Sequence, residues 1–338
     1  MRISRSRDMK RNKGTAADIF CVVGMIVAWT SYYLASDWAV EFTGSAFAAG
    51  MLLRAGALIF LTVYMLARGK FALIFKQGKT ALVLLVIGVL GYMLDTFANL
   101  GFRYGSVGTG TVLLKTDILM ANVVAALLFR ESLYASDWVA TAVMLGGVIM
   151  VLDIDFTSAG FNWYDLFFIA SAASVTANAF VIKEAQDRLG ADSDVIGYYN
   201  NFVVLVLFTV SALAAGDFRT LGELRFETWH VFALLGGGLG QTLIYVFYYR
   251  NLRRHAVWVV KLYLLFVPVL TCAAGVLFLD EAFGWLKAAG MVLVLGGAAA
   301  IALRGKINKG KIVRKDWEKE EYSRIAAKGE NYETHTTG

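Results

Sequence analysis

The sequence predicts an all-α polytopic membrane protein whose ten transmembrane helices form two inverted five-helix repeats. The first observation is the composition: 58% of the 338 residues are hydrophobic and only 17% are charged, whereas soluble domains carry about 25% charged residues. The second is a series of ten apolar windows, each close to the ~20 residues that span a bilayer. The third is a weak similarity between the two halves of the chain.

The ten apolar windows are separated by short loops, which leave no room for a soluble domain. The first window is long enough to span the membrane and lacks a small-residue cleavage site, so we expect a retained helix. The chain then divides into a basic N-terminal segment (1–16), a first repeat (17–153), a second repeat (163–303) and a charged tail (304–338). The predicted helices are 17–36, 47–66, 81–101, 106–129, 137–152, 163–182, 195–215, 229–249, 256–278 and 284–303.

The distribution of lysine and arginine predicts that both chain ends lie in the cytoplasm, because cytoplasmic loops of membrane proteins are enriched in these residues. The N-terminal segment is basic, and alternate loops carry cations such as Arg68, Lys183 and Arg250. The net charge of +6 comes largely from the two tails, so it bears on topology and predicts no nucleic-acid partner. The plasma (inner) membrane is the expected location.

The similarity between the halves indicates a duplicated unit. A shift of 150 residues places Glu131 on Glu281 and Gly147 on Gly297. Each unit contains five helices, an odd number, so the second copy enters the membrane upside down. Inverted repeats of this kind place a substrate site near the bilayer midplane, and rocking of one repeat against the other gives alternating access.

Three short features carry a resemblance to a known family: the small-residue segment SVGTGTVLL, the helix-ending acid in FRES and FLDE, and the double glycines of the following helix. Together with Arg54 in the second helix, they resemble the EamA-type units of the drug/metabolite transporter superfamily. The resemblance implies a ten-helix transporter and covers nearly the whole chain apart from its tails. One departure is Ile118, which stands where the family has a proline, while its second-copy counterpart Pro268 is kept. We therefore expect a locally straighter fourth helix.

Five charged residues lie within the predicted membrane helices: Arg54, Asp95, Lys115, Asp117 and Lys261. A charge in the bilayer core costs roughly 2.5–3.5 kcal/mol, so each should face a cavity or a partner. Four of the five belong to the first half, so the polar chemistry is asymmetric although the fold is repeated. This asymmetry fits a specific polar ligand better than a purely apolar drug.

The two lysines are the candidate anion-binding residues. Lys115 lies roughly 13 Å inside its helix, too deep for its ammonium group to reach the surface easily. It could hold an anionic group of the substrate or form a structural pair with Asp95. Lys261 could reach the headgroups or flank the same cavity from the other side. Two such lysines would suit a phosphate or carboxylate, and they resemble the basic residues of the phosphate-sugar branch of the superfamily.

The other three charges each leave two interpretations open. Asp95 could carry a proton or supply a counter-charge in the cavity, or it could brace Lys115 or Arg54. Asp117 lies on nearly the opposite side of the helix from Lys115, and it could belong to the substrate site or be a structural acid against another helix. Arg54 could contact the substrate or support the fold.

Three uncharged residues complete the predicted substrate site. Asn122 falls on the same helix face as Lys115. Tyr245 is the second-copy counterpart of Asp95, and Trp29 is a polar aromatic residue in the first helix. The sequence contains no spacing typical of a metal site, a nucleotide loop or a catalytic triad, so we expect no metal, no cofactor and no enzymatic activity.

The predicted function is secondary active transport of a small polar metabolite by alternating access, and the lysines leave an anionic substrate open. One alternative is a proton-coupled exporter of amino acids or amphipathic compounds. Alternatives of another class are an integral membrane enzyme and a non-transporting membrane scaffold. The expected partners are a small-molecule substrate, the lipid bilayer, and a coupling proton or counter-substrate, for a monomer or homodimer.

Overall fold

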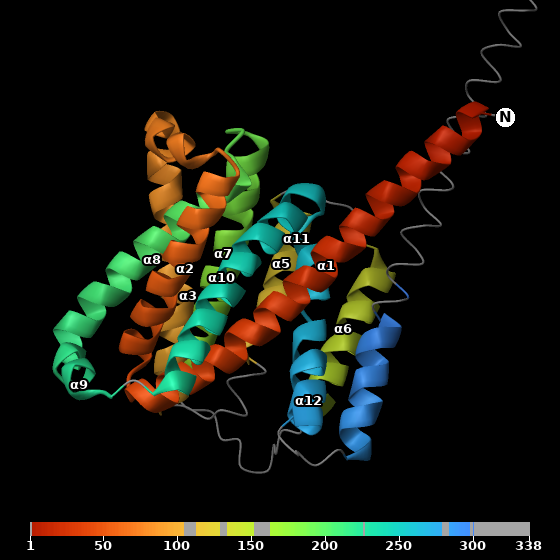
Figure 1. Ribbon diagram of the computed structural model, residues 1–338. Helices are drawn as coiled ribbons and strands as arrows, with labels where there is room; N and C mark the ends of the chain where they lie inside the picture. The colour runs from red at the N-terminus through yellow and green to blue at the C-terminus, as the bar shows by residue number, and fades with distance from the viewer. Residues whose placement is uncertain are drawn as a thin grey trace, which may run out of the picture.

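The computed structural model describes residues 2–104, 113–128, 134–151, 163–225, 227–278, 284–297 and 300. Within these ranges the chain is helical and contains no strand (Figure 1). Six helices are long and apolar enough to cross a membrane, and four shorter apolar helices accompany them in the predicted order. The prediction of an all-α polytopic membrane protein is therefore confirmed. Glu131, Glu281 and the charged tail 304–338 lie outside the described residues.

The first half contributes five helices and a short 3-10 connection. The first helix is longer than predicted, and its membrane-spanning part is Asp18–Thr43. Two 3-10 turns, η1 (Phe71–Lys76) and η2 (Gly78–Thr80), join the second helix to the third. The helices are α1 (Arg2–Thr43), α2 (Ala46–Ala67), α3 (Ala81–Tyr104), α5 (Thr116–Leu127) and α6 (Ala135–Val151).

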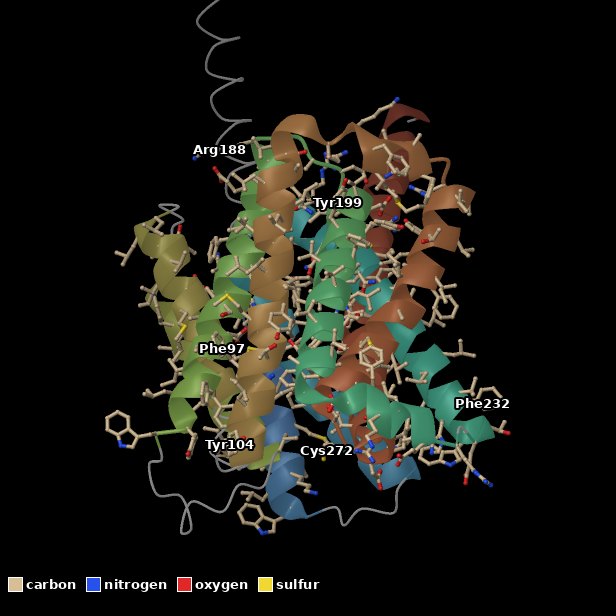
Figure 2. All side chains as sticks on the ribbon, turned by 90° about the vertical axis from the view of Figure 1, so that its left-hand side faces the viewer. Phe97, Tyr104, Arg188, Tyr199, Phe232 and Cys272 are labelled. Atoms are coloured by element: carbon tan, nitrogen blue, oxygen red, sulfur yellow. The ribbon has the colours of Figure 1, made fainter. Side chains whose placement is uncertain are left out.

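The second half repeats this plan, and its fourth span consists of two consecutive helices. A short helix, α9 (Asp217–Glu223), connects α8 to α10, and a last helix covers Trp285–Gly297. The remaining helices are α7 (Asp165–Asp187), α8 (Ser193–Ala215), α10 (Thr228–Arg254), α11 (Val257–Tyr263) and α12 (Phe266–Phe278). The end of the bundle that carries Arg188 lies opposite the end that carries Tyr104 (Figure 2).

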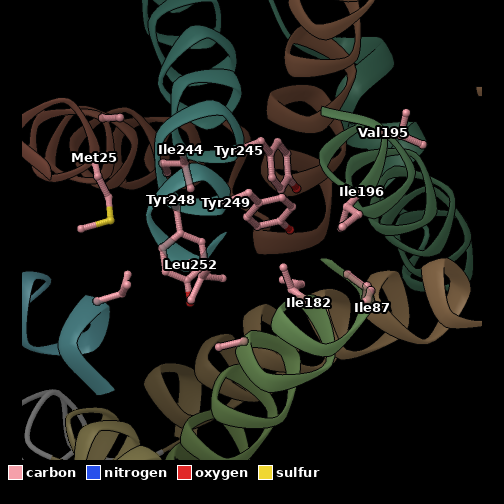
Figure 3. Close-up of a cluster of buried hydrophobic side chains, with 14 of the residues drawn as sticks. Met25, Ile87, Ile182, Val195, Ile196, Ile244, Tyr245, Tyr248, Tyr249 and Leu252 are labelled. Carbon is pink, nitrogen blue, oxygen red and sulfur yellow. The ribbon is translucent and has the colours of Figure 1, made fainter. Parts of the chain in front are cut away.

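The two halves interleave around a common core. α1 runs obliquely along α10, α2 packs on α8 and α10, and α3 packs on α7 and α8 (Figure 1). Side chains from α1, α3, α7, α8 and α10 meet in the main buried cluster (Figure 3). Because every long helix of one half touches a helix of the other, a displacement between the halves must change this core.

Glycines let two pairs of helices approach closely. A Cβ at Gly147 would lie 2.7 Å from the carbonyl oxygen of Gly290, where α6 meets the last helix. A Cβ at Gly238 would lie 2.8 Å from the carbonyl carbon of Gly56, where α10 meets α2. α10 is continuous through its glycines, so these glycines serve close packing and do not break the helix.

The fourth and ninth membrane helices are both interrupted, at equivalent positions of the repeat. The first interruption is a turn at Lys115, directly before α5 begins. The second is the turn at Leu264 and Leu265, between α11 and α12. The shift of 150 residues places Lys115 on Leu265. At both points backbone N–H groups bond to carbonyls three residues earlier, such as Ile118 to Lys115 at 3.2 Å.

The straightness of the whole fourth helix stays a prediction, because residues 106–112 lie outside the described residues. The interruption forms without proline, beside a hydroxyl that bonds to a carbonyl of the preceding turn and an acid that favours a helix start. The Thr116 hydroxyl donates to the Leu113 carbonyl at 2.6 Å, and the Asp117 carboxylate lies in the first turn of α5, where the helix dipole stabilises a negative charge.

Candidate substrate-binding site

An ion pair joins the two interrupted helices across the halves. The Lys261 ammonium donates to the Asp117 carboxylate at 2.8 Å. Lys261 lies in the last turn of α11 and Asp117 in the first turn of α5, so each charge is also favoured by the dipole of its own helix. The Lys261 side chain is only 1% exposed. Thr176 of α7 donates to the Asp117 carbonyl at 3.0 Å and fixes the start of α5.

A second ion pair lies between continuous helices. Arg54 of α2 donates to Asp95 of α3 at 2.6 Å and to the Tyr245 hydroxyl of α10 at 2.6 Å. The guanidinium also lies 5.5 Å from the centre of the Tyr32 ring, within cation–π distance. Asn201 of α8 donates to the Arg54 carbonyl at 2.9 Å. Arg54 therefore links the two halves. Of the two partners predicted for Asp95, Lys115 and Arg54, the structure shows Arg54.

Lys115 differs from the other four charges. Its residue is half-buried at the interruption, and no carboxylate in the described ranges lies within ion-pair distance of it. It lies close enough to Asp117 and Lys261 to interact with their charges. The predicted alternative, a structural pair with Asp95, is not formed. Among the three intramembrane cations, Lys115 is thus the one that forms no ion pair with the described residues.

Aromatic side chains from α1 and α10 surround the two ion pairs. Tyr245, Tyr248 and Tyr249 project together from α10 into the core (Figure 3). The Trp29 ring lies 5.3 Å from the Tyr33 ring and 6.3 Å from the Tyr248 ring. The Trp29 indole N–H is buried and has no hydrogen-bond acceptor among the described residues, so it is a donor that a polar ligand could use.

Asn122 contacts a neighbouring helix of the same half. Asn122 is fully buried and donates to Thr141 of α6 at 3.3 Å, so it links α5 to α6. The sequence analysis missed Tyr32, Tyr248 and Thr176. The i, i+3 and i+4 spacing of the tyrosines on α10 was a signal that could have found Tyr248.

The described residues contain no group of three or more histidine, cysteine, aspartate or glutamate side chains that could hold a metal ion. What they do contain is a buried set of ion-paired and aromatic groups inside an apolar bundle. Buried charges among membrane helices, placed where helices are interrupted, define the class of polytopic transport proteins.

Comparison with known proteins gives the family. The sequence matches the EamA-like transporter family over residues 16–153 and 162–303. The chain therefore belongs to this family of drug/metabolite-type membrane transporters, and each match covers one repeat. A search of curated proteins found no match.

Solved structures share the fold. One of them, described as "Crystal structure of protein", has a TM-score of 0.67 and 17% sequence identity, and the similarity covers 86% of this chain and 99% of that chain. At this identity the similarity establishes the fold alone.

Proposed function

We propose that the protein is a secondary active transporter that moves a small polar metabolite by alternating access. The observation that supports this most is the Lys261–Asp117 pair. It joins the two interrupted helices of opposite halves, so rocking one half against the other would move or break it. A buried ion pair adds little net stability because desolvation offsets its attraction. Its position is better explained by a role in substrate binding and conformational change.

An anionic group of the substrate would bind at Lys115. Lys261 is already engaged with Asp117, so the two lysines do not act as equal clamps. Lys115 lies at the N-terminal end of α5, where the helix dipole favours an anion. The Trp29 indole and the tyrosines of α10 would supply neutral contacts.

Counterflow in reconstituted vesicles tests this role of Lys115. Lys115→Ala should lower counterflow of the transported anion at least tenfold, the loss of about 1.4 kcal/mol of binding, with thermal stability close to wild type. Arg188→Ala is the matched control, because Arg188 is exposed and pairs only with Glu184 one turn away. Unchanged counterflow in Lys115→Ala would exclude an anion clamp at this residue.

A proton-coupled exporter is the second candidate, supported by Asp95. Its side chain is 20% exposed although it pairs with Arg54, so it could gain and lose a proton during the cycle. Flux measured with and without a pH gradient separates this candidate from an exchanger. In a proton-coupled exporter, Asp95→Asn should abolish the response to the gradient while counterflow persists.

We also propose that the protein lies in the plasma membrane with both chain ends in the cytoplasm, because the loops around Arg68, Lys183 and Arg250 are basic. Labelling of single cysteines placed in these loops, in intact cells, tests this orientation. Transport by a chain that lacks residues 305–338 would argue against a scaffold whose activity depends on the tail. Turnover of a lipid-linked substrate would favour the enzyme alternative.

A further inference from the structure

A basic cavity lies at the end of the bundle where α2 and α10 end and α8 begins. Its volume is about 180 Å³, several times the ~30 Å³ that a water molecule occupies in the liquid. The cavity is separate from the intramembrane ion pairs, because its lining residues lie at helix ends and in loops. Five cations line it: Arg68, Lys70, Arg250, Arg253 and Arg254.

Three of these cations already have anionic or hydroxyl partners. The Lys70 ammonium donates to Asp192 at 2.7 Å and to Asp194 at 2.6 Å. Arg250 donates to the Tyr64 hydroxyl at 2.6 Å. Arg254 forms its ion pair with Asp18 of α1 at 2.7 Å.

The pKa values of Lys70 and Asp192 reflect the interaction between these two groups. Burial lowers the pKa of Lys70, but hydrogen bonds to Asp192 and Asp194 outweigh burial and hold the pKa above its usual value. Burial raises the pKa of Asp192, but the hydrogen bond and charge of Lys70, together with the backbone N–H groups of Asp194 and Val195, outweigh burial and hold the pKa below its usual value. The two acids that line the cavity are therefore paired with Lys70 and, for Asp194, also with Arg250 at 3.9 Å.

Arg68 and Arg253 supply the remaining positive charge. No carboxylate in the described ranges lies within ion-pair distance of either side chain, and both residues are exposed. A cation at a helix C-terminus is favoured by the helix dipole. That effect explains why these arginines end their helices, but not why they converge on one cavity from α2 and α10.

We infer that this cavity binds a phosphate-type anion, which bridges Arg68 of the first half and Arg253 of the second. Guanidinium groups bind phosphate oxygens in pairs of parallel hydrogen bonds. The cavity lies at the membrane surface, where an anionic lipid headgroup or a free phosphate could supply the anion. Because the site joins both halves, its ligand stabilises the conformation in which Arg68 and Arg253 line one cavity.

Thermal unfolding in lipid nanodiscs tests the inference. Replacing part of the phosphatidylcholine with phosphatidylglycerol should raise the Tm of the wild type by at least about 2 °C. The double variant Arg68→Gln/Arg253→Gln should lose this rise, and its affinity for phosphatidylglycerol in native mass spectrometry should fall at least about tenfold. Arg188→Gln, on the same end but outside the cavity, should keep the full response.

Two further measurements identify the source of the anion and check that the double variant folds. If millimolar inorganic phosphate raises the Tm in pure phosphatidylcholine as phosphatidylglycerol does, the ligand is a free anion. If only phosphatidylglycerol does, it is a lipid headgroup. The double variant should unfold within about 2 °C of wild type in pure phosphatidylcholine, because exposed residues without partners contribute little stability. The inference is overturned if neither anion raises the Tm, or if the double variant keeps the full rise.

Discussion

The two helix interruptions occupy the same place in the repeat but differ in every chemical respect. The one in the first half has a lysine at its turn, an aspartate two residues later and no proline. The one in the second half has Leu264 and Leu265 at its turn and Pro268 shortly after. Leu265 is fully buried in a small cluster with Ile118 and Met144.

The two copies therefore share the interrupted backbone but differ in the side chains that accompany it. Both copies need an interrupted helix, and each obtains it by different local means. Only the first copy has charged residues at its interruption. The second copy carries Lys261 one turn before its interruption, and this lysine pairs with the first copy.

Lys261→Met should destabilise the protein most. It removes the ion-pair partner of the buried Asp117 carboxylate, which costs about 3–5 kcal/mol of unfolding free energy. Reversible unfolding in mixed detergent micelles measures this value. The double variant Lys261→Met/Asp117→Leu should recover most of the loss, because it removes both charges. A double variant as unstable as the single one would show that packing, and not the uncompensated charge, is the cause.

Leu265→Lys makes the second interruption resemble the first. The new ammonium would enter an apolar site that is 0% exposed, and an unpaired charge there should cost about 2.5–3.5 kcal/mol. The same unfolding assay measures the loss. Leu265→Met is the control for size and should cost less than about 1.5 kcal/mol. A stable Leu265→Lys variant would mean that the two interruptions tolerate charge equally.

Arg54→Met tests the ion pair that lies away from either interruption. The loss of unfolding free energy should be smaller, about 2 kcal/mol. The Asp95 side chain is 20% exposed, so it can be hydrated or protonated. Thermal unfolding of Arg54→Met beside Lys261→Met provides the comparison. An equal or greater loss in Arg54→Met would show that position at an interruption does not increase the cost of an unpaired charge.

Pro268→Ala should have the smallest effect, less than about 1 kcal/mol. The interruption at Lys115 forms without proline, so Pro268 should not be needed for its counterpart. Tm and counterflow measure the outcome. Val123→Pro is the contrasting variant: Val123 is 43% exposed inside α5, so proline there should cost about 3 kcal/mol through the backbone alone. A large effect of Pro268→Ala would assign the second interruption to proline.

Much of the fold was predictable because hydropathy and length are local properties. A segment such as Ser193–Ala215 has to be helical in a bilayer, where backbone groups must bond within their own segment, and the sequence alone identifies it. The intramembrane charges Arg54, Asp95, Lys115, Asp117 and Lys261 were visible for the same reason. Helix ends were less accurate, as the length of α1 shows.

The choice of partners was decided only by the tertiary structure. Lys261 and Asp117 are 144 residues apart, and Arg54 and Tyr245 are 191 apart, and no local pattern selects such pairs. The interruption at Lys115 was missed because it depends on Thr116 and Asp117 and not on proline. The sequence by itself determined which charges are buried in the membrane. The packing of α5 against α11 decided that Asp117 is neutralised by Lys261, while Lys115 forms no ion pair with the described residues.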